Sequence, residues 1–105
     1  MGAVVWSEPA VVDLDAIHAF IARNSRRYAD RIVQRMTQKV GLLSVFPLRG
    51  WVVNEFQGSG VREIVVKPYR ILYEVRGDDC YVLAVVHGSQ DLGKALDPDD
   101  WSKRT

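Results

Sequence analysis

The stretch VREIVVKPYRILYEV, at residues 61–75, decides the fold. It is rich in β-branched and aromatic residues on both sides of Pro68, and this composition is typical of strands. Proline cannot donate a hydrogen bond to a sheet, so Pro68 and Tyr69 mark a break between strands. The stretch therefore predicts two neighbouring strands, Val61–Lys67 and Arg70–Val75.

Two further strands flank this pair along the chain. Residues 51–56 and 81–86 have the same strand-forming composition. Residues 58–60, two glycines around a serine, separate the first two strands, and residues 77–79 favour a tight turn before the last one. Because each connection is short, we expect the four strands to form a mostly antiparallel meander.

The N-terminal half of the chain follows a helical period instead. A short apolar strand at Ala3–Trp6 precedes Ser7, which can cap a helix that ends near Asn24. Ser25 can begin a second helix, which Pro47 stops. Apolar residues recur at helical spacing in both helices. They are Ala10, Leu14, Ile17 and Ile21 in the first helix, and Ala29, Ile32, Met36, Val40 and Leu43 in the second.

The fold class follows from the order of these elements. Almost no linker joins the two helices, so an antiparallel hairpin packed on one face of the sheet is the economical arrangement. Asp13, Asp15 and Arg23 of the first helix are expected to face water. The predicted class is α+β, with an N-terminal strand, a helical hairpin and a mostly antiparallel sheet of four to five strands. The face of the sheet away from the helices is expected to stay partly open.

Length and composition favour a single domain over residues 1–105, with its core at about 3–92 and a tail at 93–105. Hydrophobic residues make up 48% of the chain and charged residues 26%, which is an ordinary globular balance. Cys80 is expected to be a buried thiol in a strand, which fits a reducing cytoplasm. Because no apolar run is long enough to span a bilayer, no membrane association is expected.

Charge is unevenly distributed, although the formal net charge is only +1. Cations cluster in and around the second helix, at Arg23, Arg26, Arg27, Arg31, Arg35 and Lys39. Proteins that grip nucleic acid through many phosphates usually carry a clear basic excess. That excess is missing here.

Five short segments of the chain carry a resemblance to a known family. They are WSEPA at 6–10, DLDAI at 13–17, VREI at 61–64, PYRILY at 68–73 and VHGSQD at 86–91. Their order and spacing, over about residues 3–92, resemble the RelE/ParE superfamily of bacterial toxins. The resemblance implies the toxin of a type II toxin–antitoxin system, held inactive by a cognate antitoxin whose partly disordered segment folds on binding.

The resemblance leaves the target open. RelE-like members cleave messenger RNA in the ribosome, whereas ParE-like members act on DNA gyrase by binding. RelE-like ribonucleases usually present many Lys and Arg with a Tyr or His-Tyr pair near the last strand, whereas His87 here is followed by Gly-Ser-Gln-Asp. Gyrase inhibition is therefore the leading expectation. The alternatives are a ribosome-dependent endoribonuclease and an inactive family member kept as a binding partner.

A RelE-like ribonuclease would need cations that stabilise charge on the phosphate and groups that transfer protons. Arg62 and Arg70 can supply the charge and His87 can transfer a proton. Glu55 or Glu63 could act as the base. These are the catalytic candidates if the chain is RelE-like.

Each of these candidates also has a structural interpretation. Arg62 can pair across the sheet with Glu74 or Glu55. Arg70, in the Tyr-Arg-Ile segment, can be structural or can face the antitoxin. His87, at the end of an apolar strand, can be a packing residue.

Binding to the antitoxin or the target is expected to use cationic and aromatic side chains. Arg27, Arg31 and Arg35 lie four residues apart and share one helical face, which is either a solvated face or a docking surface for an acidic partner. The other binding candidates are Arg62, Tyr69, Arg70, His87 and Trp101.

Aromatic residues could also stack on bases if they lined an exposed groove. The five considered are Trp51, Tyr69, Tyr73, Tyr81 and Trp101. Strand alternation places about half of them in the core, and Tyr73 in particular. The sequence has no Cys/His set at metal-ligand spacing, no Gly-rich phosphate loop after a strand and no Ser-His-Asp order, so neither a metal nor an organic cofactor is expected.

Overall fold

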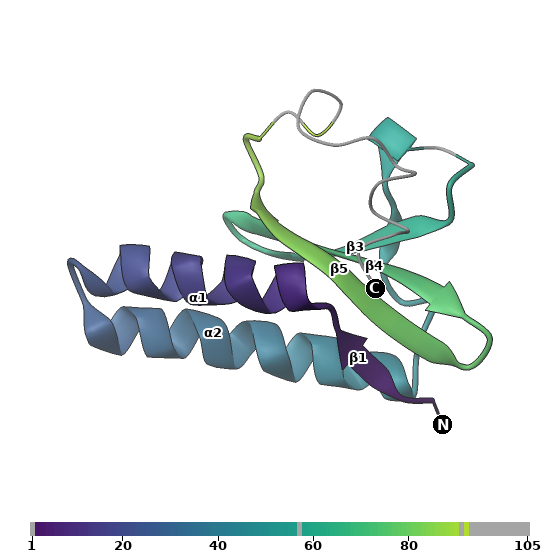
Figure 1. Ribbon diagram of the computed structural model, residues 1–105, viewed down its shortest axis with the longest axis horizontal. Coiled ribbons are helices and arrows are strands. Elements are labelled where there is room, and N and C mark those ends of the chain that lie inside the picture. Colours follow the sequence, from purple (N-terminus) through teal and green to yellow (C-terminus); the bar gives the residue numbers. More distant parts are fainter. Residues whose placement is uncertain (1, 57, 91, 93–105) are drawn as a thin grey trace.

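A computed structural model of the chain describes residues 2–56, 58–90 and 92. Within these residues one strand leads into two helices, and four strands follow (Figure 1). The elements are β1 (Val4–Trp6), α1 (Glu8–Ala22), α2 (Arg26–Gly41), β2 (Trp51–Val52), β3 (Val61–Val66), β4 (Tyr69–Arg76) and β5 (Asp79–His87), with the short 3-10 helices η1 (Leu42–Ser44) and η2 (Asn54–Phe56). The predicted α+β order is confirmed.

Two serine caps set where the helices begin. The Ser7 hydroxyl accepts a hydrogen bond from Ala10 N, and the Ser25 hydroxyl accepts one from Tyr28 N. Both starts were predicted, because an oxygen at the cap satisfies an amide that the first turn leaves without an intrahelical partner. The predicted end of the second helix at Pro47 is wrong. α2 ends at Gly41, a poor helix former, and the chain tightens into η1.

The helices form an antiparallel hairpin on one side of the sheet (Figure 1). The strand order is β1-β5-β4-β3-β2. β2 to β5 pair antiparallel in sequence order, and β1 pairs in parallel with β5. At the turn between β4 and β5, Gly77 has a φ of 62°, a left-handed conformation that favours glycine. The mostly antiparallel sheet is confirmed.

Two of the predicted strands have different limits. The strand expected over residues 51–56 stops at Val52, and residues 54–56 turn into η2, since Asn54 and Glu55 are poor strand formers. Tyr69, expected in a turn, is already part of β4 and pairs with His87. The break that Pro68 imposes is therefore shorter than expected.

Alternation along the strands divides the core into two layers. The larger layer lies between the helices and the sheet and contains Ala10, Ile32, Met36, Val40, Leu43, Ile64, Val66, Tyr69, Ile71, Tyr73, Cys80, Val82 and Val85. A smaller layer on the opposite face contains Val53, Phe56, Val61, Leu72, Leu83, Ala84, Val86 and Leu92. The predicted burial of Tyr73 and Cys80 is confirmed. The tail expected at 93–105 lies outside the described residues.

Polar contacts fasten α1 to its neighbours. His18 Nε2 lies 2.7 Å from Asp30 Oδ1 of α2, and Val85 N of β5 donates to Asp13 Oδ2 at 3.0 Å. The expectation that Asp13 faces water is therefore wrong, because this half-buried carboxylate accepts a strand amide. Among the helices that the structure describes, none has the length and apolar character to cross a membrane.

Candidate functional site

Arg70 holds together two acidic side chains on the face of the sheet away from the helices. Its Nη1 donates to Glu55 Oε2 at 2.8 Å, and its Nη2 donates to Glu55 Oε1 at 3.0 Å. Its Nε donates to Glu63 Oε2 at 2.9 Å, and Nη2 also contacts that oxygen. The guanidinium therefore links β4, β3 and η2. Four of its five N–H groups are occupied by carboxylates.

This bidentate pairing changes both partners' protonation equilibria. The hydrogen bonds from Arg70 lower the pKa of Glu55 despite the opposing effect of burial. The hydrogen bonds that Arg70 donates to Glu55 are the main reason that the pKa of Arg70 is raised. A carboxylate held ionised by an arginine is a weak general base, and an arginine neutralised twice attracts phosphate poorly.

Arg62 has partners other than the predicted Glu74 or Glu55. Its Nη1 donates to Gly50 O at 2.9 Å and more weakly to Leu48 O at 3.4 Å. Glu74 instead contacts Arg76, and Glu55 pairs with Arg70. The Arg62 guanidinium therefore fastens the chain that leads from η1 to β2.

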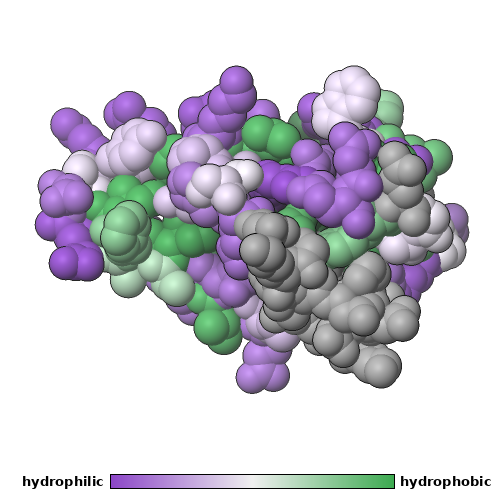
Figure 2. Space-filling model, turned by 90° about the horizontal axis from the view of Figure 1, so that it is seen from above, coloured by the Kyte–Doolittle hydropathy of each residue, from purple (hydrophilic) through white to green (hydrophobic). Residues whose placement is uncertain are grey.

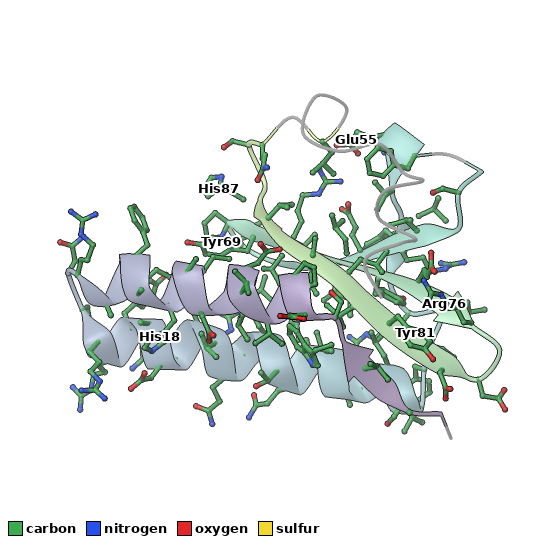
Figure 3. The ribbon with its side chains drawn as sticks, in the orientation of Figure 1. His18, Glu55, Tyr69, Arg76, Tyr81 and His87 are labelled. Atoms are coloured by element: carbon green, nitrogen blue, oxygen red, sulfur yellow. The ribbon has the colours of Figure 1, made fainter. Side chains whose placement is uncertain are left out.

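His87 lies at the exposed end of β5, beside the buried ring of Tyr69 (Figure 3). The two rings meet edge to face, with centroids 5.6 Å apart. Ser89 N donates to His87 Nδ1 at 3.1 Å, and the Ser89 hydroxyl lies 2.7 Å from the same nitrogen. Because Nδ1 accepts from the backbone, the proton of the neutral ring belongs on Nε2.

The structure does not bring the three catalytic candidates together. Arg62 pairs with Tyr73, and His87 pairs with Tyr69, so they share a face but lie four residues apart along β4. Four strand residues correspond to roughly 13 Å. Arg70 follows Tyr69 in β4 and so points to the opposite face. A catalytic role for this trio stays a prediction, and the geometry offers it no shared site.

The other predicted binding residues lie on separate surfaces. Arg27, Arg31 and Arg35 are exposed on α2. Trp51 is the most exposed of the four aromatic candidates that the structure describes, whereas Tyr81 is half-buried with Arg76 Cζ 4.6 Å from its ring centroid (Figure 3). Trp101 lies outside the described residues.

An apolar face of α1 was not predicted as a binding surface. Val12 and Phe20 are 60% and 63% exposed, Val11 is also exposed, and Ala16 and Ala19 lie between them. We call these five residues the α1 face. Figure 2 shows green apolar side chains among purple polar ones over the hairpin, in the left half of the view. The sequence could have indicated this surface, because apolar residues occupy more sides of α1 than the sheet can cover.

A second exposed apolar surface follows α2. Val45, Phe46, Leu48, Trp51 and Val52 are all exposed, and we call them the loop surface. Residues 45–49 line a depression of about 620 Å³. The signal in the sequence was an apolar run around Pro47, where only the end of a helix was predicted. An exposed apolar run of this kind, outside helices and strands, commonly marks an interaction site.

The fold and a family match over most of the chain define a small α+β protein of the RelE/ParE toxin superfamily. Residues 4–92 match the family described as the ParE toxin of the type II toxin–antitoxin system parDE. The chain therefore belongs to the ParE toxin family, whose members are the toxin component of such systems. The resemblance found in the sequence is confirmed, and the family implies a cognate antitoxin as partner.

Named relatives and a solved structure agree with this assignment. Toxin ParE3 of Caulobacter vibrioides is 29% identical over 97 residues, covering 91% of this chain and 96% of the relative. Toxin RelE2 of the same organism is 31% identical over 91 residues, covering 86% and 99%. A structure described as the chromosomal ParDE system from P. aeruginosa matches with a TM-score of 0.68 at 23% identity, over 83% of this chain and 96% of that chain. At that identity the likeness is one of fold.

Proposed function

We propose that this toxin inhibits DNA gyrase by binding it, and that the cognate antitoxin neutralises the toxin by covering its exposed apolar surface. The observation that supports the proposal is that the arginine candidates for catalysis are already hydrogen-bonded within the chain. Arg70 is occupied by Glu55 and Glu63, and Arg62 is occupied by backbone carbonyls. An activity that needs only surface contact requires none of these groups to be free. Because gyrase acts on the chromosome, the proposal makes the toxin a cytoplasmic protein.

The α1 face supports the antitoxin part of this proposal. Its small residues, Ala16 and Ala19, allow another helix to approach closely, and Val12 and Phe20 offer apolar contacts on either side. A disordered segment that folds into an amphipathic helix would bury these residues. His87 lies at the exposed end of β5, the strand that packs against α1, and would extend the same contact (Figure 3).

Expression of the chain alone in bacteria tests the target. Gyrase inhibition predicts growth arrest with filamentation and a DNA-damage response, while messages stay intact. Rapid cleavage of messages at ribosomal codons would identify the endoribonuclease alternative and sink the gyrase proposal. Normal growth at a high level of folded protein would identify an inactive member kept as a binding partner.

Co-expression with the product of the adjacent reading frame tests the neutralising surface. Phe20→Glu should leave the toxin active but reduce rescue by the antitoxin, because a charge would be buried at the helix contact. The matched control is Gln34→Glu, which places the same charge on an exposed position of α2. Equal rescue of both variants would show that the antitoxin binds elsewhere.

A further inference from the structure

The loop surface is exposed but rigidly held. Phe46 and Leu48 are 59% and 62% exposed in the segment between η1 and β2, and Trp51, the first residue of β2, is 76% exposed. Exposed apolar loops ordinarily gain little from being fixed, because ordering a chain costs conformational entropy. The structure nevertheless fixes this one from beneath.

Two side chains of the sheet clamp the loop through its backbone. Tyr73 lies in the core, and its hydroxyl donates to Pro47 O at 2.8 Å and accepts from Gly50 N at 2.9 Å. Arg62 donates to Gly50 O and Leu48 O. Four hydrogen bonds thus hold residues 47–50. Gly50 is required here, since a Cβ would lie 2.6 Å from Glu63 O and from the Tyr73 ring.

A fixed loop with protruding aromatic side chains suits one kind of partner. Because the loop backbone is already ordered by hydrogen bonds, it would lose little entropy on association. Protruding Phe and Trp side chains act as anchors when they enter pockets that already exist on a folded partner. A segment that folds on binding has no such pockets, so the loop surface and the α1 face suit different partners.

The charges beside the loop surface narrow the partner's chemistry. Lys39 and Arg49 share a hollow of about 150 Å³ with Trp51 and Glu63. Glu55 and Glu63 share the single positive charge of Arg70, so the two cations Lys39 and Arg49 still outweigh the one uncompensated negative charge on this side. Lys39 follows Arg35 by four residues, so it continues the line of cations that Arg27, Arg31 and Arg35 form along one face of α2. On the other side, Val45 and Pro47 share a hollow with Asp78.

We propose that the loop surface is the contact through which the toxin binds gyrase, with Phe46, Leu48 and Trp51 entering a preformed apolar pocket bordered by carboxylates. The inference rests on the proposed function. It assigns Arg62 and Tyr73 as positioning residues, which act by holding the loop. The loop surface and the α1 face come from different parts of the chain, so binding of gyrase and binding of the antitoxin use separate contacts.

Supercoiling of relaxed plasmid by purified gyrase tests the inference with the full chain. The wild type is measured first, followed by Phe46→Ser/Leu48→Ser. Both side chains are largely exposed, so the double variant should fold, which circular dichroism and urea unfolding verify. We expect its half-inhibitory concentration to rise about tenfold or more. The matched control, Tyr28→Ser/Leu42→Ser, removes two exposed apolar side chains that belong to neither the loop surface nor the α1 face, and it should inhibit like the wild type.

The outcomes separate the inference from the proposed function. A wild-type chain that leaves supercoiling unchanged would refute the gyrase proposal itself. Full inhibition by the folded loop variant, or an equal loss of inhibition in the loop variant and in the control, would overturn the inference while leaving gyrase as the target. A loop variant that loses affinity for plasmid DNA without gyrase present would assign the surface to nucleic acid, and would also overturn it.

The positioning role has its own readout. Tyr73→Phe keeps the ring but removes both hydrogen bonds to the loop, so inhibition should weaken in protein that is still folded. Faster amide hydrogen exchange at residues 48–50, with unchanged exchange in α1, is expected along with it. Unchanged exchange in the loop together with full inhibition would contradict the clamp.

Discussion

The hydroxyl of Tyr73 accepts a hydrogen bond from the amide of Gly50 at 2.9 Å, although the two residues are 23 positions apart. The Gly50 amide is buried, so removal of its acceptor leaves a donor without a partner. Tyr73→Phe should therefore lower the free energy of unfolding by about 1–3 kcal/mol, measured by urea denaturation.

Tyr28→Phe is the control for this substitution, because Tyr28 is exposed on α2. It should change the free energy of unfolding by no more than about 0.5 kcal/mol. Equal effects of the two substitutions would mean that the buried hydroxyl of Tyr73 contributes nothing to the free energy of unfolding, and that only the ring does.

The ion pair between Arg70 and Glu55 should make stability depend on pH. The pKa of Glu55 is lowered in the folded chain, so its contribution is present above the ordinary carboxyl pKa and is lost as the pH falls through the lowered value. The Glu55 side chain is 37% exposed, which limits the effect to roughly 0.5–1 kcal/mol. Urea unfolding of the wild type and Glu55→Gln should differ by this amount at pH 7 and converge in acid. A difference that grows on acidification would contradict the assignment.

Asp13 should matter far more than Asp15, its neighbour in α1. Asp13 accepts from Val85 N, whereas Asp15 is exposed. Asp13→Ala should cost about 1.5–3 kcal/mol of unfolding free energy, since it removes a charged acceptor from a strand amide. Asp15→Ala should stay within about 0.5 kcal/mol. Similar values for both variants would show that the contact with β5 adds no stability.

Cys80 should be unreactive in the folded chain. It is fully buried, and burial raises the pKa of its thiol, so little thiolate forms at neutral pH. A disulfide reagent such as Ellman's should label it only as fast as the chain unfolds. Labelling at the rate of a free thiol, in protein shown to be folded, would contradict this burial.

The elements that could be predicted are those with local causes. Ser7 and Ser25 cap helices through amides three residues away, and the Gly77 turn joins strands that are adjacent in sequence. The meander and the burial of Tyr73 follow from alternation along single strands. Such features need no knowledge of distant residues.

The contacts that prediction missed join distant parts of the chain. Asp13 meets Val85 across 72 positions, and Arg62 meets Gly50 only because the loop folds back over the edge of the sheet. Charge pattern alone suggested a glutamate as the partner of Arg62, since cross-strand pairs are common. The exposed α1 face likewise depends on how much of the helix the sheet covers, and helical spacing cannot show this.

A toxin that acts through surface contacts needs no proton transfer by His87. The decisive measurement is growth after induction of His87→Ala, at a level of folded protein equal to that of the wild type. Growth arrest as complete as with the wild-type chain is expected. Normal growth of cells that contain the folded variant would contradict it and return His87 to the centre of a catalytic mechanism.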